Sequence, residues 1–158
     1  MAEAMLSLAP HNGWTYRLTL MDKRRAHGIL QVLGSVLALA GCFVKICDKS
    51  NHWNTLHGQF AMAFTSVSLV NGLAAHYSSS LPRWFPKTIT KLGHICFGTV
   101  AFAAASISLC YGFDKGGFKN WINPTLAYVF MALTALFTLI IILPPLNTFY
   151  RKSKSMFS

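Results

Sequence analysis

The sequence has 158 residues, which is enough for one domain of ordinary size, and 53% of them are hydrophobic while only 11% are charged. Soluble domains contain about 25% charged residues, so lipid must cover part of this chain's surface. The net charge of +10 does not indicate nucleic acid as a partner, because the basic residues lie at the ends of apolar runs rather than on one contiguous surface.

The chain begins with a short apolar segment, MAEAMLSLAP, at residues 1–10. This segment is too short to cross a bilayer, and it has Glu3 and no basic leading region, so it does not read as a signal peptide. Taken alone, it predicts a stub at the membrane interface.

Four stretches without Lys, Arg, Asp or Glu follow, and they predict four membrane-spanning helices. A helix needs about 20 apolar residues to cross a hydrocarbon layer about 30 Å thick. Asn123–Pro124 is typical of a helix start, and Pro144–Pro145 of a helix end. We therefore expect an all-α, multi-pass helix bundle in one domain, with helices near residues 26–46, 56–76, 92–113 and 124–143.

The basic residues orient this bundle. Loops on one predicted side carry ten Lys and Arg residues, and loops on the other side carry four. Because short cytosolic loops are enriched in Lys and Arg, the first side, which includes the C-terminus, is predicted to be cytosolic.

Three histidines, His27, His57 and His94, each lie in the first turn of a predicted helix. A single histidine there is commonly an interfacial anchor. Because alternate helices run in opposite directions, however, His27 and His94 should share one depth near the cytosolic face, with His57 near the other. Two imidazoles at one depth can hold a haem iron between helices. Zinc is less favoured, because no third or fourth ligand lies near either histidine.

The stretches RRAHGILQVLG, HWNTLHGQ, LPRW and KLGHICFG, with the closing helix and its basic tail, resemble the cytochrome b561 family of transmembrane reductases. Within it, the likeness is greatest to the b561-domain-containing branch. The resemblance implies six membrane helices with two haems between the middle four, and the four helices here would be the third to the sixth. His27 and His94 would then be the cytosolic haem pair, and His57 one ligand of the outer haem.

One family feature is missing. The family's second helix begins with the histidine that pairs with His57, and no residue at the right depth precedes His27. Residues 1–10 resemble the end of that helix. We therefore expect the chain to be N-terminally truncated relative to the family and to hold at most one haem stably.

By the resemblance, the function would be ascorbate-dependent electron transfer through haem b, from cytosolic ascorbate to monodehydroascorbate or ferric iron. The expected partners are the lipid bilayer, these small molecules and a second copy of the chain, without nucleic acid, in an endomembrane such as the endoplasmic reticulum or a cytoplasmic vesicle. Candidate contacts to ascorbate or to the haem propionates are Lys23, Arg24, Arg25 and Lys91, and His52 is a candidate on the acceptor side. The alternative is a non-catalytic, truncated four-helix membrane protein with incomplete haem sites.

Overall fold

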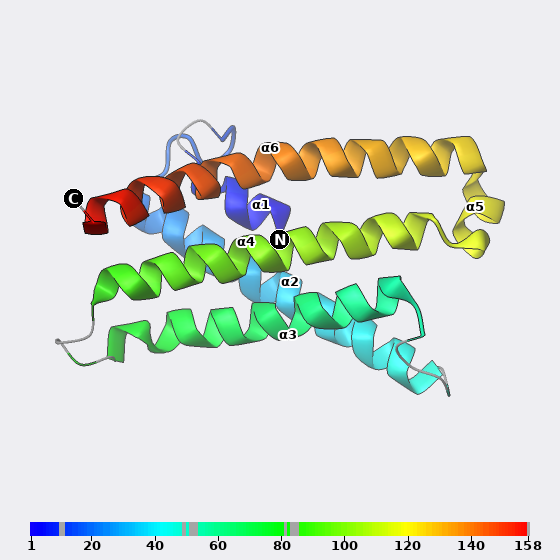
Figure 1. The fold of residues 1–158 in the computed structure, drawn as a ribbon, viewed down its shortest axis with the longest axis horizontal. Coiled ribbons are helices and arrows are strands. Elements are labelled where there is room, and N and C mark those ends of the chain that lie inside the picture. The colour runs from blue at the N-terminus through cyan, green and yellow to red at the C-terminus, as the bar shows by residue number, and fades with distance from the viewer. Residues whose placement is uncertain (10–11, 49, 51–53, 81, 83–85, 158) are drawn as a thin grey trace.

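Four long helices dominate the part of the chain that the computed structural model describes, which comprises residues 1–9, 12–48, 50, 54–80, 82 and 86–157. Figure 1 shows α3, α4 and α6 extended along the long axis, while α2 crosses them at an angle. The predicted all-α bundle is confirmed. In chain order, its elements are α1 (Ala2–Leu6), α2 (Leu20–Asp48), α3 (Leu56–Tyr77), the 3-10 turn η1 (Ser78–Ser80), α4 (Lys87–Phe113), α5 (Gly116–Ile122) and α6 (Pro124–Phe157).

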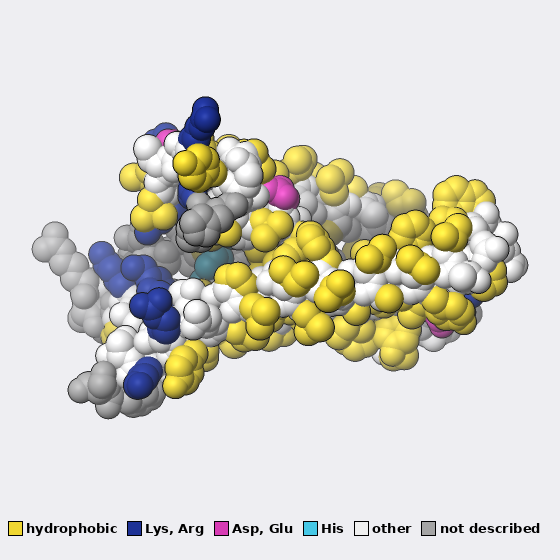
Figure 2. Space-filling model, turned by 90° about the horizontal axis from the view of Figure 1, so that it is seen from above, with side chains coloured by type: hydrophobic (Ala, Val, Ile, Leu, Met, Phe, Trp, Pro, Cys, Tyr) yellow, Lys and Arg dark blue, Asp and Glu magenta, His cyan; other side chains and the backbone are white. Residues whose placement is uncertain are grey.

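One end of the bundle is basic. The start of α2, the start of α4 and the end of α6 lie together there (Figure 1, left). Figure 2 shows most of the Lys and Arg side chains of one face at this basic end, beside a histidine, while hydrophobic side chains cover the middle. Large apolar residues stay exposed on the long helices, such as Leu37 and Leu139 at 65% and 64%. This distribution matches a bundle whose middle lies in lipid.

Three helices in the described residues, α2, α4 and α6, are long and apolar enough to cross a membrane. The fourth predicted crossing, α3, has 22 residues and so meets the length requirement, but it is not among the three. Its polar residues Thr65, Ser68 and Asn71 lower its hydropathy, and all three are buried. These three polar groups of α3 therefore face protein rather than lipid.

The predicted end of the last helix is wrong. The helix α6 continues through Pro144 and Pro145 to Phe157. Two consecutive prolines remove two N–H donors from the helix, but membrane helices tolerate this where other groups satisfy the freed carbonyls. The carbonyls that lose their donors are those of Ile140 and Ile141, one turn earlier, and one turn later the hydroxyl of Thr148 donates to the Pro144 carbonyl at 2.9 Å within the continuing helix. The predicted start is confirmed, since the Asn123 side chain accepts from the Thr125 N–H at 2.8 Å.

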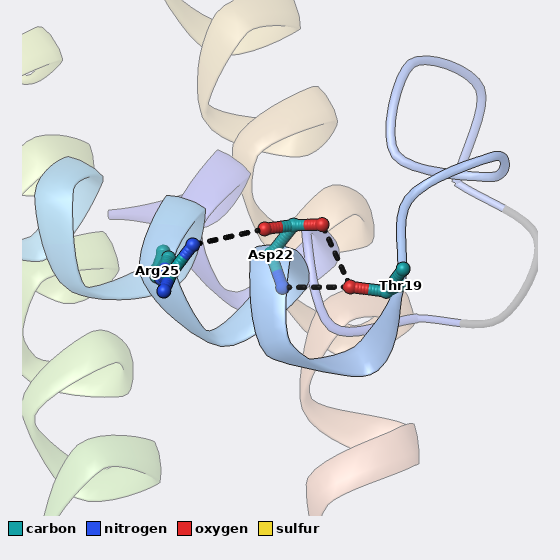
Figure 3. A network of polar contacts seen from close by, with 3 residues as sticks. All are labelled: Thr19, Asp22 and Arg25. Carbon is teal, nitrogen blue, oxygen red and sulfur yellow. Dashed lines mark hydrogen bonds and ion pairs between the residues drawn. The ribbon is translucent and has the colours of Figure 1, made fainter.

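The helix α2 begins at Leu20, six residues before the predicted boundary, because polar residues cap it (Figure 3). The Asp22 N–H donates to the Thr19 hydroxyl at 3.3 Å, and this hydroxyl donates to the Asp22 carboxylate at 2.7 Å. Arg25 pairs with the same carboxylate at 3.4 Å. This reciprocal cap satisfies an N–H that would otherwise lack a partner in the first turn, so the helix extends through the charged residues that precede the apolar run.

The expected location of the first segment at the membrane interface is also wrong. The helix α1 packs against α2 and α6, and Ala4 and Ser7 are fully buried. Met1 lies close to Gly34, halfway along α2, so α1 reaches into the bundle. Its small residues permit this close packing, and Glu3 accepts hydrogen bonds from the side chains of Asn12 and Trp14.

A short helix, α5, connects α4 to α6 at the end opposite the basic end. The Lys119 ammonium pairs with the Asp114 carboxylate and donates to the Tyr128 hydroxyl at 3.2 Å. These two hydrogen bonds, the one to Asp114 first, raise the pKa of Lys119. They hold the connection against the start of α6.

Replacing the cap of α2 should weaken the bundle modestly. Thr19→Val removes the hydroxyl that accepts from Asp22, and loss of such a cap costs about 0.5–2 kcal/mol. Thermal unfolding in detergent should therefore start at a lower temperature. The control is Thr125→Val, because the exposed Thr125 contributes its backbone N–H rather than its hydroxyl to a cap. Equal unfolding temperatures for the two variants would contradict the role of Thr19.

Candidate haem-ligand site

Two of the predicted ligand histidines meet near the basic end. His27 of α2 and His94 of α4 have ring centroids 6.1 Å apart and ring planes at 81°. Two metal–imidazole bonds of about 2 Å each, plus the two ring radii, place ring centres about 6 Å apart. The separation therefore suits two imidazoles that share one metal ion between them.

His94 is held by an asparagine of the neighbouring helix. Its Nδ1 lies 3.1 Å from the Asn71 side-chain oxygen, and the Asn71 amide nitrogen donates to the His94 carbonyl at 3.2 Å. Asn71 is buried, with 5% of its surface exposed. This polar residue thus uses both ends of its amide on one histidine.

His27 is held by α1. Its Nδ1 lies 2.6 Å from the Ala4 carbonyl oxygen, and both residues are at least half-buried. The apolar N-terminal segment therefore has a specific role in this fold, because it brings a hydrogen-bond acceptor to the histidine.

His57 of α3 lies near the opposite end and is held by α4. Its Nδ1 lies 2.7 Å from the Ser108 carbonyl oxygen and 3.2 Å from the Ser108 hydroxyl, which in turn donates to the His57 carbonyl at 2.9 Å. The sequence analysis predicted no hydrogen bond at Ser108. The structure adds the hydrogen bonds.

The three histidines share one hydrogen-bonding pattern. In each, Nδ1 faces an oxygen acceptor, so the proton lies on Nδ1 and the lone pair on Nε2. Metal-ligating histidines have this arrangement, because the bond at one nitrogen fixes the tautomer and orients the other toward the metal. All three side chains are therefore prepared to ligate through Nε2.

The two polar links between α3 and α4 share one antiparallel register. Asn71 lies 14 residues after His57, and Ser108 lies 14 residues after His94. At 1.5 Å per residue, the two levels are about 21 Å apart along the helices. The equal 14-residue spacing is a signal in the sequence that could have identified Asn71 and Ser108. Once α3 and α4 are aligned antiparallel, Ser108 lies opposite His57, and Asn71 lies opposite His94.

A cavity of about 1080 Å³ lies beside His57, between α2, α3 and α4. Its volume is at the upper end of the range of about 300–1,000 Å³ for sites of small molecules and cofactors. Small residues line its walls, among them Ala38, Gly41, Ala61 and Ala105, and Lys45 and Lys115 line it as well. A flat ring fits between these small residues, and acidic substituents on the ring suit the two lysines. In the described residues, no three His, Cys, Asp or Glu side chains gather, and a porphyrin iron needs only two protein ligands.

The basic residues predicted near the cytosolic pair, His27 and His94, differ in their surroundings. Lys23 is buried, and its ammonium donates to the Ala9 carbonyl at 3.1 Å, so it ties α2 to the segment that follows α1. Arg25 pairs with Asp22. Arg24 and Lys91 are exposed. His52 lies outside the described residues, and any role of these residues toward ascorbate stays a prediction.

Comparison with known proteins assigns the chain to a class. The family model for eukaryotic cytochrome b561 matches residues 1–119, and the chain belongs to this family of membrane electron-transfer proteins. It is 29% identical to transmembrane reductase CYB561D2 of Homo sapiens over 96% of this chain and 72% of that protein. The same protein of Mus musculus is 29% identical over 95% and 70%, and that of Bos taurus 28% over 96% and 72%. No solved structure matches the chain significantly.

Removing the Lys23 ammonium should loosen α1 specifically. A hydrogen bond from a charged group contributes about 1.5–3 kcal/mol, so Lys23→Met should speed hydrogen exchange at the α1 amides, which mass spectrometry measures. Arg24→Met is the matched control, because its side chain is exposed on the adjacent position. If the α1 amides exchange at the same rate in both variants, Lys23 does not hold this segment.

Proposed function

We propose that this chain is a haem b-dependent transmembrane electron carrier. It takes electrons from cytosolic ascorbate at its basic end and delivers them to monodehydroascorbate or ferric iron at the other. The observation that carries the proposal is the shared pattern of His27, His57 and His94, whose Nδ1 atoms face oxygen acceptors at two levels of one bundle.

This geometry supports the following ligand assignment. His27 and His94 would hold one haem b at the basic end, and His57 would supply one ligand to a second haem in the cavity at the opposite end. When bound, the haem iron accepts and gives up one electron at a time. The chain orients the imidazoles, and its apolar walls exclude water from them.

The exposed cations of the basic end are suited to attract an anionic electron donor. Arg24 lies three residues before His27 and Lys91 three residues before His94, so each precedes its histidine by about one turn toward that end. Ascorbate and haem propionates are both anions that such groups bind by charge-assisted hydrogen bonds. Lys45 and Lys115 are the corresponding candidates for propionates at the outer cavity. His52 remains the candidate on the acceptor side.

The chain would act as a cytochrome b561 domain over residues 1–158, in an endomembrane, with its basic end and C-terminus in the cytosol. The count of ten against four basic residues supports this orientation. A second copy of the chain is a candidate partner. The alternative is a non-catalytic four-helix membrane protein, favoured by His57, whose cavity has no second histidine among its described lining residues.

A reduced-minus-oxidised difference spectrum of the purified chain tests the proposal. We expect a haem b spectrum that ascorbate alone produces, at no more than one haem per chain. His94→Ala and His27→Ala should each abolish the absorbance, since one imidazole cannot hold the haem at the inner site. The control is His76→Ala, which removes an exposed histidine at the other end of α3 from His57.

Three results are decisive. A colourless wild-type chain would support the non-catalytic alternative and overturn the proposal. A ratio near two haems per chain would overturn the assignment of an incomplete outer site. Absorbance retained in His94→Ala would show that the ligand pair is wrong.

A further inference from the structure

We propose that Asn71 is a positioning residue that sets the orientation and the electron-donor strength of His94, and thereby the reduction potential of the inner haem. This inference rests on the proposed function, because it concerns a ligand of the haem assigned there. Asn71 lies on α3, which provides neither ligand of that haem, so the helix that carries His57 would also tune the site at the basic end.

The amide of Asn71 can adopt only one orientation here. Its nitrogen donates to the His94 carbonyl at 3.2 Å, which leaves its oxygen 3.1 Å from His94 Nδ1. The flipped amide would place two oxygens against each other at the carbonyl. The oxygen must therefore accept from Nδ1, and the lone pair of His94 lies on Nε2.

His94 depends on this side chain more than the other two histidines depend on theirs. The Nδ1 atoms of His27 and His57 face the backbone carbonyls of Ala4 and Ser108, which no substitution removes. The Nδ1 atom of His94 instead faces the side-chain oxygen of Asn71. Among the three, the ligand strength of His94 is thus the one that a single residue can change.

A glycine makes room for Asn71 between α3 and α4. A Cβ atom at Gly98 would lie 3.2 Å from the Asn71 amide nitrogen, which is tighter than ordinary van der Waals contact. Gly98 lies one turn after His94, beside the carbonyl that Asn71 binds. The absence of a side chain at Gly98 therefore lets the buried Asn71 amide reach His94 on the adjacent helix.

Chemistry predicts the direction of the change. A neutral amide leaves the imidazole neutral. The hydrogen bond from Nδ1 to the Asn71 oxygen makes Nε2 a stronger donor, which favours the ferric iron over the ferrous iron, so losing this bond should raise the midpoint potential. A leucine at position 71 would leave Nδ1 without its acceptor and the ring without its constraint.

The experiment compares variants of the whole chain, purified with haem in lipid nanodiscs. The readouts are the midpoint potential, the low-spin ferric electron paramagnetic resonance spectrum and the rate of haem loss to an apo-protein acceptor. Asn71→Leu should weaken haem binding about 10–100-fold. It should also raise the midpoint potential, by about 59 mV if losing the hydrogen bond disfavours the ferric state tenfold.

Two matched variants separate this role from simple packing. Gly98→Ala should reproduce part of the Asn71→Leu effect by displacing the amide. Gly93→Ala should not, because nothing lies within 4 Å of a Cβ atom at that position. The Gly98 variant also serves if the Asn71→Leu variant does not fold.

The outcomes distinguish the two proposals. Coloured variants at position 71 and at Gly98 with the wild-type potential, resonance spectrum and rate of haem loss would overturn the role of Asn71 and leave the proposed function intact. A colourless wild-type chain would overturn the proposed function and this inference together.

Discussion

The close packing of α3 against α4 is the interaction on which the rest of the structure depends. Two polar links join these helices, His57 with Ser108 and Asn71 with His94, and the same 14-residue interval separates the two links on each helix. The small residue Gly98 lets the backbones approach closely enough for the inner link. Once α3 and α4 are in this register, the depth of both histidine levels is determined.

The lipid environment explains why so many polar side chains are paired inside the bundle. With no water in the hydrocarbon layer, a polar group must find a partner within the protein. Buried Lys23 donates to the Ala9 carbonyl, and buried Thr65 donates to the Ala61 carbonyl. The same rule accounts for Thr65, Ser68 and Asn71 of α3, which are buried against protein rather than exposed to lipid.

The proposed function depends on the histidine nitrogens that remain after the polar side chains have paired within the protein. Each of the three histidines uses Nδ1 within the protein, so Nε2 is the nitrogen left to bind a ligand. At the basic end, two such rings lie with their centroids 6.1 Å apart and their planes at 81°, whereas at the opposite end His57 borders a cavity with small residues and two lysines. The family membership of the chain supports the proposal that this arrangement is a site of electron transfer.

The sequence by itself determined the helical class, the long helices and the common depth of His27 and His94, because apolar runs and alternating helix directions are local properties of the chain. It misplaced the end of α6 and the depth of residues 1–9, since both depend on contacts outside the segment concerned. Only the tertiary structure decided which acceptor each histidine faces. Asn71 and His94 are 23 residues apart in the chain, and nothing short of the α3–α4 register brings that amide to that imidazole.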